Sequence, residues 1–267
     1  MRTKRLTVEG WIKLGVFAVC LAFCVYSLVW CCVGMVRNGK ELSTVLTCLV
    51  SIACLFVPEI AQKLFRFRIS TAVYLLILIY AVTPTLGHSY EFYTRVKGWD
   101  KFMHTTGGVV FAMFGAYLPK LFTKNEDCNL WVCILCGFCF SLTMSVLWEF
   151  YEYFCDSVLG KDMQKDTILS FIQSYKISDN PFSDIGRIDG ITGVIVETAN
   201  GPVRLPLAGY LDIGLVDTMN DMLVETAGAL VYCIVYAIDK GKYTAFKYLP
   251  KENATVQNAE TETTENI

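Results

Sequence analysis

Long apolar runs constrain the fold of this chain more than any other feature of its sequence. A helix needs about 20 largely apolar residues to cross roughly 30 Å of bilayer hydrocarbon. Six segments meet that requirement, which are residues 14–36, 42–61, 69–86, 99–122, 130–159 and 213–238. Hydrophobic residues make up 54% of the chain and charged residues only 18%, which is typical of a membrane protein. The sequence therefore predicts an all-α integral membrane protein with six transmembrane helices.

Two prolines are expected to end predicted helices. Pro58 is followed by Glu59 near the end of the second segment, and Pro84 precedes Gly87 near the end of the third. Proline lacks the backbone N–H group, and its ring clashes with the preceding helical turn. We therefore expect the second helix to stop near Pro58 and the third within residues 83–88.

Basic residues indicate how the chain is oriented. The N-terminus is basic, as in a signal peptide, but the apolar run that follows is too long and lacks a small-residue cleavage site. We therefore expect an uncleaved first span. Lys and Arg are more frequent in the short loops on the side of the N-terminus, and they mark the cytoplasmic side. The sequence predicts a multi-pass protein of the cell (plasma) membrane with both termini in the cytoplasm.

The fifth segment ends with the sequence WEFYEYFCD, residues 148–156. Glu149, Glu152 and Asp156 stand at i, i+3 and i+7, so they share one face of a helix. They also lie at its C-terminal end, where the helix dipole disfavours negative charge. Such a stripe requires a compensating partner.

Two further polar stripes begin the fourth and sixth segments. Asp100 and His104 are i and i+4, and Gly107 and Gly108 follow one turn later, where missing side chains allow close helix packing. Taken alone, Asp100 is equally consistent with a helix N-cap and His104 with a satisfied core histidine. The sixth segment carries a second acidic stripe at i, i+4 and i+8, formed by Asp217, Asp221 and Glu225.

The predicted topology brings the three stripes into one leaflet, because the fourth and sixth segments start at the outer surface and the fifth ends there. At 1.5 Å per residue, His104 lies about 6 Å below Asp100, Glu149 about 10 Å below Asp156, and Glu225 about 12 Å below Asp217. We therefore expect the three stripes to meet at a common depth.

The loop between the fifth and sixth segments is long, from residue 160 to residue 212. Residues 192–198 are rich in β-forming side chains and lead into Asn200-Gly201, a strong hairpin turn signal. Residues 203–207 can return as a second strand, although Pro206 restricts it to an edge. We expect a small extracytoplasmic β-hairpin, since a loop of this length is more often a lid or binding element than a plain connection.

These features divide the chain into three parts. Residues 1–98 are predicted to form an N-terminal three-helix scaffold. Residues 99–239 form a three-helix half that carries the acidic site and the extracytoplasmic loop. Residues 240–267 form a polar cytoplasmic tail, predicted to be disordered from Glu252 onward.

The cysteines are expected to be core residues. Nearly all twelve fall inside apolar runs. Cys133, Cys136 and Cys139 recur at every third position of a predicted helix, which is not the pattern of a zinc knuckle in an aqueous loop. Small polarizable thiols pack well in cores, and no disulfide framework is evident.

The crowded acids predict a cation site. Carboxylates inside a membrane are costly and usually face the bundle interior, and only Lys101 and His104 lie nearby as cations. Protonation or a bound cation must relieve the repulsion. Oxygen ligands with one imidazole suit Mg²⁺, Mn²⁺, Ca²⁺ or Zn²⁺. The candidate metal ligands are Glu149, Glu152, Asp217, Asp221 and Glu225. Water-bridged structural carboxylates and an ion pathway are the alternatives.

The same residues carry a family resemblance. The order WDKFMH, WEFYEYFCD, DMQKD and GYLDIGLVDTMNDM, over residues 99–230, resembles the uncharacterised bacterial YjdF-like inner-membrane family. The matching acidic and histidine positions are Asp100, His104, Glu149, Glu152, Asp217 and Asp221. A more distant resemblance is to VanZ-like proteins, linked to glycopeptide resistance. The hairpin loop and acidic tail do not match that family, so its role is not carried over. The YjdF-like resemblance implies a membrane site but no reaction.

The leading functional hypothesis is a divalent-metal-dependent enzyme acting on a lipid or lipid-linked small molecule at the outer interface. The metal would polarise an oxygen or activate water, and the candidate catalytic residues His104, Asp100 and Asp156 would move protons. Asp100 would also orient His104. A cation or proton-coupled transporter and a non-catalytic structural protein are the alternatives. No P-loop, dinucleotide fingerprint or nucleophile motif is present, and no basic aromatic patch suggests nucleic acid.

Overall fold

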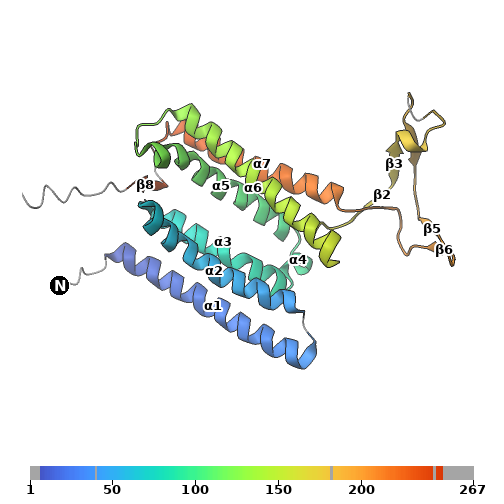
Figure 1. Ribbon diagram of the computed structural model, residues 1–267, viewed down its shortest axis with the longest axis horizontal. Coiled ribbons are helices and arrows are strands. Elements are labelled where there is room, and N and C mark those ends of the chain that lie inside the picture. The colour runs from blue at the N-terminus through green and yellow to red at the C-terminus, as the bar shows by residue number, and fades with distance from the viewer. Residues whose placement is uncertain (1–6, 40, 181–182, 243–244, 249–267) are drawn as a thin grey trace, which may run out of the picture. The chain divides into compact units, whose positions relative to one another are not determined.

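A computed structural model describes residues 7–39, 41–180, 183–242 and 245–248 (Figure 1). The predicted disorder from Glu252 onward falls outside these residues. The long helices of the protein are α1 (Val8–Asn38), α2 (Leu42–Phe65), α3 (Thr71–Ser89), α5 (Trp99–Thr123), α6 (Leu130–Leu159) and α7 (Leu215–Ile238). The short helices are α4 (Phe92–Arg95) and η1 (Tyr175–Ile177).

The strands are short and pair only two at a time. They are β1 (Phe67–Ile69), β2 (Thr167–Leu169), β3 (Phe171–Ser174), β4 (Gly186–Asp189), β5 (Ile195–Thr198), β6 (Gly201–Arg204), β7 (Tyr210–Asp212) and β8 (Phe246–Tyr248). The antiparallel pairs are β1–β8, β2–β7, β3–β4 and β5–β6. The chain is therefore mostly helical with small antiparallel strand pairs.

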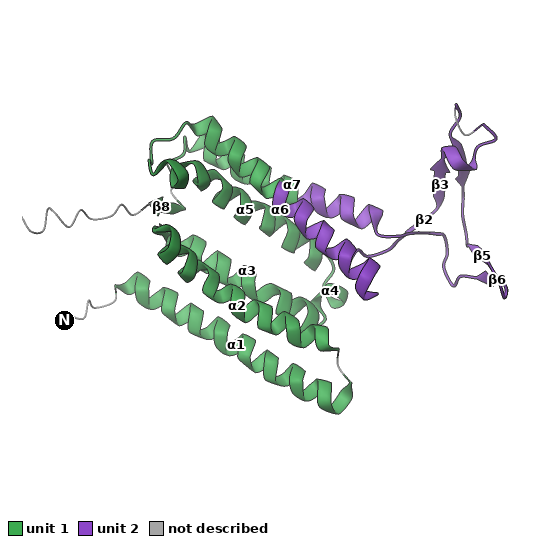
Figure 2. Ribbon diagram, in the orientation of Figure 1, with its two compact units in different colours: residues 1–142, 225–267 green, residues 143–224 purple. Residues whose placement is uncertain are grey.

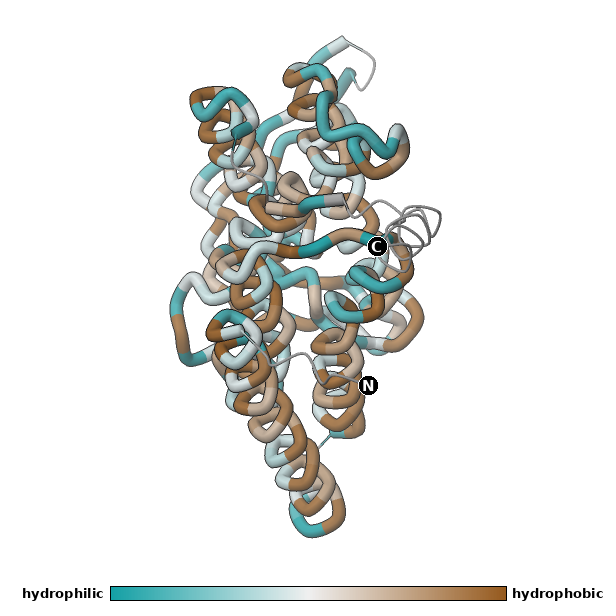
Figure 3. Tube along the Cα trace, turned by 90° about the vertical axis from the view of Figure 1, so that its left-hand side faces the viewer, coloured by the Kyte–Doolittle hydropathy of each residue, from teal (hydrophilic) through white to brown (hydrophobic). Residues whose placement is uncertain are grey.

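Five helices are long and apolar enough to cross a membrane among the described residues, namely α1, α2, α3, α6 and α7. Figure 3 shows that the hydrophobic colour follows the helical coils and that hydrophilic colour gathers at their connections. Large apolar side chains on these helices are exposed, such as Val19 at 70% and Trp131 at 69%. This pattern fits helices that face lipid. Helix α5 covers the predicted fourth span but is not among the five, so a sixth span is not confirmed.

The predicted end of α2 at Pro58 is wrong, whereas α3 ends at Ser89, directly after the predicted stretch 83–88. Pro58 lies inside α2, which continues to Phe65, and Pro84 lies inside α3, which continues to Ser89. Neighbouring helices and local hydroxyl groups can satisfy the backbone groups that proline frees, as is common in membrane helices. Thr83 illustrates this, because its Oγ1 donates a hydrogen bond of 2.6 Å to the Tyr80 carbonyl.

The chain forms two compact units (Figure 2). Residues 1–142 and 225–267 make the first, and residues 143–224 make the second. Helices α6 and α7 each contribute to both units, because the boundaries fall inside them. The predicted three-part division follows other boundaries and stays a prediction.

In the first unit, α1, α2 and α3 pack on one another, and α3 also contacts α5. Cys31 of α1 and Cys48 of α2 both lie 3.4 Å from the Ser89 hydroxyl of α3, and all three residues are buried. Such small polar side chains allow membrane helices to approach closely. The buried thiols confirm that these cysteines are core residues.

Glycines permit the closest helix approaches. A Cβ atom on Gly108 of α5 would overlap the backbone carbonyl of Glu225 in α7, and one on Gly228 would overlap that of Thr105. Farther along α5, a Cβ on Gly115 would lie 2.9 Å from the Cys136 carbonyl of α6. The predicted close packing at Gly108 is confirmed, and its partner is α7.

In the second unit, the last turns of α6 and the first turns of α7 are joined by the long loop. Strands β5 and β6 pair around Asn200, with Thr198 opposite Gly201, where φ is 104°. Only glycine adopts that backbone conformation readily. The loop also contains the pairs β2–β7 and β3–β4, so it is more structured than the single predicted hairpin.

Candidate functional site

Most of the predicted site residues are buried. Those with less than a tenth of their surface exposed are His104, Glu149, Glu152, Asp217, Asp221 and Glu225, whereas Asp100 and Asp156 are partly exposed. Ionisable groups are costly to bury unless partners or a bound ion compensate the charge. Each of these buried groups therefore requires a compensating partner within its own surroundings.

His104 and Glu225 contact each other inside the first unit. The Nδ1 atom of His104 lies 3.5 Å from the Oε2 atom of Glu225. The contact follows from the glycine crossing of α5 and α7, because Gly108 lies one turn beyond His104 and packs on the Glu225 backbone. The other carboxylate oxygen of Glu225, Oε1, is buried and has no hydrogen-bond partner in the described part of the chain.

Within the first unit, Asp100 and His104 offer a carboxylate and an imidazole that can act as metal ligands. Asp100 and His104 come from successive turns of α5, and Asp221 lies one turn before Glu225 in α7. The Nζ atom of Lys101 lies 3.8 Å from Oδ2 of Asp100. Carboxylate and imidazole groups are donors that suit a hard or borderline divalent cation.

Tyr80 of α3 belongs to the surroundings of this pair, although its sequence context gave no sign of it. Its hydroxyl would lie 2.8 Å from a Cβ atom on Gly107, so the glycine leaves room for the phenol. Tyr80 also interacts electrostatically with Glu225. The third predicted span was interpreted as scaffold because nothing in its pattern connects a tyrosine to a carboxylate far along the chain.

The acids of the second unit bind the loop that follows α6. Both oxygens of Asp156 accept backbone hydrogen bonds, Oδ1 from Met163 at 2.6 Å and Oδ2 from Gln164 at 2.8 Å. Oδ2 of Asp217 accepts one from the Lys165 backbone at 3.1 Å. These contacts give Asp156 an anchoring role, while its predicted catalytic role stays a prediction.

Gln164 ties the same segment to α7, since its Nε2 donates a hydrogen bond of 2.6 Å to the Thr218 hydroxyl. Residues 162–166, the DMQKD motif, therefore connect the end of α6 to the start of α7. The sequence of this motif indicates only a family resemblance. Its structural role depends on contacts across about fifty residues of sequence, which no local pattern reveals.

Acidic crowding extends into this loop. Partial burial raises the pKa of Asp166, and the negative charges of Asp162, Asp212 and Asp156 raise it further. Glu152 is held within α6, where the Trp148 indole Nε1 donates a hydrogen bond of 2.8 Å to its Oε1. Glu149 and Glu152 stay predicted metal ligands, as do Asp217 and Glu225.

Comparison with known proteins identifies a family but no reaction. A family profile described as a predicted membrane protein, DUF2238, matches residues 16–241, which is most of the chain. No curated protein and no solved structure matches. The match is consistent with the uncharacterised YjdF-like resemblance and leaves the resemblance to VanZ-like proteins unconfirmed. The apolar helices, the buried acidic and histidine residues and this match together show that the chain belongs to the DUF2238 family of predicted membrane proteins.

Proposed function

We propose that this protein is a divalent-metal-dependent enzyme that acts on a lipid or lipid-linked substrate. The observation that carries the proposal is the buried contact between His104 and Glu225, in which one carboxylate oxygen is left without a hydrogen-bond partner in the described chain. A buried carboxylate oxygen without a donor is destabilising, and a nearby cation offsets that cost.

The contact is the usual arrangement behind a metal-binding histidine. A histidine that ligates a metal commonly gives its other ring nitrogen to a carboxylate, which fixes the tautomer and raises the basicity of the ligand. With Nδ1 of His104 directed to Glu225, its Nε2 would be the atom that binds the metal. Asp100, one turn before His104 on α5, would supply an oxygen ligand, and Asp221 stays a ligand predicted from the sequence.

Such a metal would polarise a phosphoryl or carbonyl oxygen, or lower the pKa of a bound water. Carboxylates left outside the metal's coordination would then move protons. The exposed apolar helix surfaces would let a lipid substrate reach the site from the bilayer. In this proposal α5 is a sixth span, both termini are cytoplasmic, the membrane is the plasma membrane, and the structured loop lies outside as a lid.

The first test is metal content. The protein purified in detergent would be loaded in turn with Mg²⁺, Mn²⁺, Ca²⁺ and Zn²⁺, and bound metal would be measured by elemental mass spectrometry. We expect about one ion per chain in the wild type and a loss of tenfold or more in affinity for Asp221→Asn and for Glu225→Gln. Glu197→Gln is the matched control, because Glu197 is an exposed carboxylate on β5.

If no ion binds to a folded wild-type protein, the metalloenzyme proposal is wrong. The His104–Glu225 contact would then indicate a proton relay, as in a proton-coupled transporter, or a structural contact between helices. Comparing proton uptake by wild-type and Glu225→Gln proteoliposomes would separate these two.

A further inference from the structure

Strands β1 and β8 form a two-stranded ribbon at the end of the first unit where α2 stops and α3 begins. Their register places Arg68 directly opposite Lys247. Side chains alternate between the two faces of a strand. Phe67, Ile69 and Phe246 are buried on one face, and Arg68 and Lys247 are exposed on the other.

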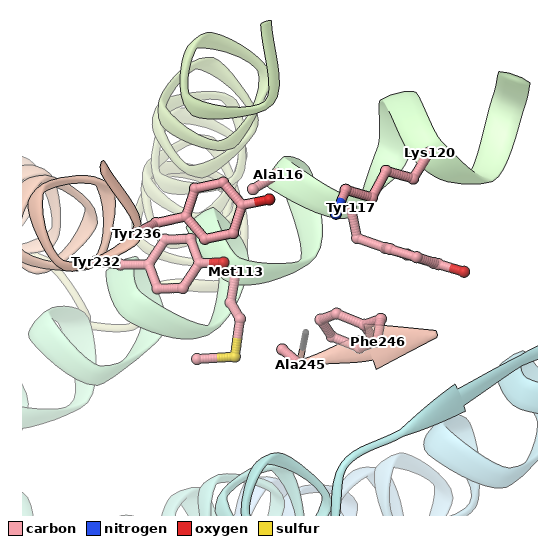
Figure 4. A pocket seen from close by; sticks show the side chains of 8 residues that line it. All are labelled: Met113, Ala116, Tyr117, Lys120, Tyr232, Tyr236, Ala245 and Phe246. Carbon is pink, nitrogen blue, oxygen red and sulfur yellow. The ribbon is translucent and has the colours of Figure 1, made fainter. Parts of the chain in front are cut away.

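Aromatic packing holds the ribbon in place. The ring of Phe246 stacks on Tyr117 of α5 at 5.3 Å and meets Phe67 edge-on at 5.6 Å. Figure 4 shows Phe246 at a small hollow lined also by Tyr117 and Lys120. The Ser70 backbone N–H donates to the Ala245 carbonyl at 2.8 Å, which closes the ribbon. Arg68 and Lys247 therefore cannot separate without disrupting a packed aromatic cluster.

Like charges placed directly opposite each other destabilise a strand pair. Neither Arg68 nor Lys247 makes an ion pair within the described residues. Lys13 adds a third cation close enough to repel Arg68, and its Nζ donates to the Ile69 carbonyl at 2.7 Å. Glu9 and Glu59 interact electrostatically with Lys13. An anion between Arg68 and Lys247 would turn this repulsion into attraction.

We propose that Arg68 and Lys247 bind the phosphate group of an anionic membrane phospholipid. The ribbon lies between the end of α2 and the start of α3, which are both candidate spans, so it lies at the level of the lipid headgroups. A guanidinium group binds phosphate through two parallel hydrogen bonds, and an ammonium group adds a mobile charge. Lys63, Lys124 and Lys240 are also exposed at the ends of α2, α5 and α7, and the exposed Asp127 follows α5. The proposal does not depend on the metal site.

The sharpest test is Lys247→Glu, which places a carboxylate opposite Arg68. In lipid-free detergent the variant should melt at a higher temperature than the wild type, because repulsion becomes attraction. Its affinity for phosphatidylglycerol should fall, because the phosphate loses one ligand and meets a negative charge. The control is Lys124→Glu, which makes the same charge change at the same end of the bundle.

Lipid binding would be measured by native mass spectrometry and by titration in nanodiscs, with phosphatidylcholine as the zwitterionic reference. We expect the affinity of Lys247→Glu for phosphatidylglycerol to fall at least about tenfold below that of Lys124→Glu, since a charge-assisted hydrogen bond is lost as well as net charge. If Lys247→Glu does not fold, Lys247→Gln against Lys124→Gln gives the same comparison.

Equal losses in the two variants would overturn the proposal and leave only diffuse attraction between a basic surface and anionic lipid. A second experiment measures how inorganic phosphate, without lipid, changes the thermal stability of the wild type and of Lys247→Glu. If phosphate alone stabilises the wild type as much as phosphatidylglycerol does and has no effect on Lys247→Glu, the ligand is a soluble phosphate compound. The lipid assignment is then wrong.

Discussion

At the scale of single residues, the missing side chain of Gly108 decides how α5 meets α7. A methyl group there would overlap the Glu225 carbonyl, so the two helices could not approach as they do. The same approach sets the 3.5 Å contact between His104 and Glu225. The glycine therefore supports both the packing of the first unit and its candidate site.

We predict that Gly108→Ala lowers the free energy of unfolding by about 1–3 kcal/mol, because a well-packed interface must move to admit the methyl group. Thermal unfolding in detergent would measure the change. Gly15→Ala in α1 is the control, since a Cβ atom there meets nothing within 4 Å. A Gly108→Ala protein as stable as this control would contradict the tight crossing.

Asp156 anchors the loop through two backbone hydrogen bonds. We predict that Asp156→Ala lowers the free energy of unfolding by about 1–3 kcal/mol, because two backbone N–H donors lose their acceptor. Amide hydrogen exchange should become faster at Met163 and Gln164. Ser157→Ala, at an exposed neighbouring position, should leave both rates unchanged. Unchanged exchange in Asp156→Ala would contradict the anchoring role.

At the scale of elements, several acids lie close together where the loop between α6 and α7 meets the two helices. Burial and three neighbouring acids raise the pKa of Asp166. A raised pKa means that the folded chain holds this proton more tightly than the unfolded chain. Ionised Asp166 therefore destabilises the fold at pH values above its folded pKa, and the effect disappears at pH values below its ordinary value of 3.8.

We predict that Asp166→Asn raises the free energy of unfolding at neutral pH by about 0.5 kcal/mol or less, since solvent screens this exposed group. The gain should vanish at acidic pH, where the wild-type carboxyl is also neutral. Thermal midpoints measured across the pH range would test the sign. A gain that persists at low pH would mean that the amide, and not the lost charge, stabilises the loop.

The positions of the helices and most of their ends followed closely from the apolar runs, whereas the predicted stop at Pro58 did not. The predicted stop at Pro58 rests on the loss of a backbone hydrogen bond, and α2 continues past it to Phe65. The end of a helix depends on whether neighbouring groups satisfy the freed carbonyl. That is a property of the packed structure, so the local sequence is a weak guide to it.

At the scale of the whole molecule, the status of α5 decides the topology. Its first turns carry Asp100, Lys101 and His104, which lower its mean hydropathy, and α5 is not among the five candidate spans. If α5 crosses the membrane, the two termini lie on the same side. If it does not, they lie on opposite sides.

We predict six crossings and termini on the same, cytoplasmic, side. Fusions of alkaline phosphatase and of green fluorescent protein after Lys97, after Lys124 and at the C-terminus would report the side of each point. Phosphatase activity is expected only after Lys97, and fluorescence only after Lys124 and at the C-terminus. The same reporter responding after Lys97 and after Lys124 would exclude α5 as a span.

The sequence alone determined that this is a helical membrane protein and approximately where its long helices lie. It also singled out the acidic and histidine side chains and the hairpin turn at Asn200-Gly201. These features can be recognised in the sequence because the length of an apolar run, helical spacing and turn-forming residues are local properties.

Only the tertiary structure decided which of these residues meet. It placed Glu225 against His104 and Arg68 opposite Lys247. It also assigned Asp156 to the backbone of the DMQKD segment. Each pair except the last is separated by more than a hundred residues of sequence. Such contacts depend on helix crossings and strand register, which packing over the whole chain selects and no local pattern encodes.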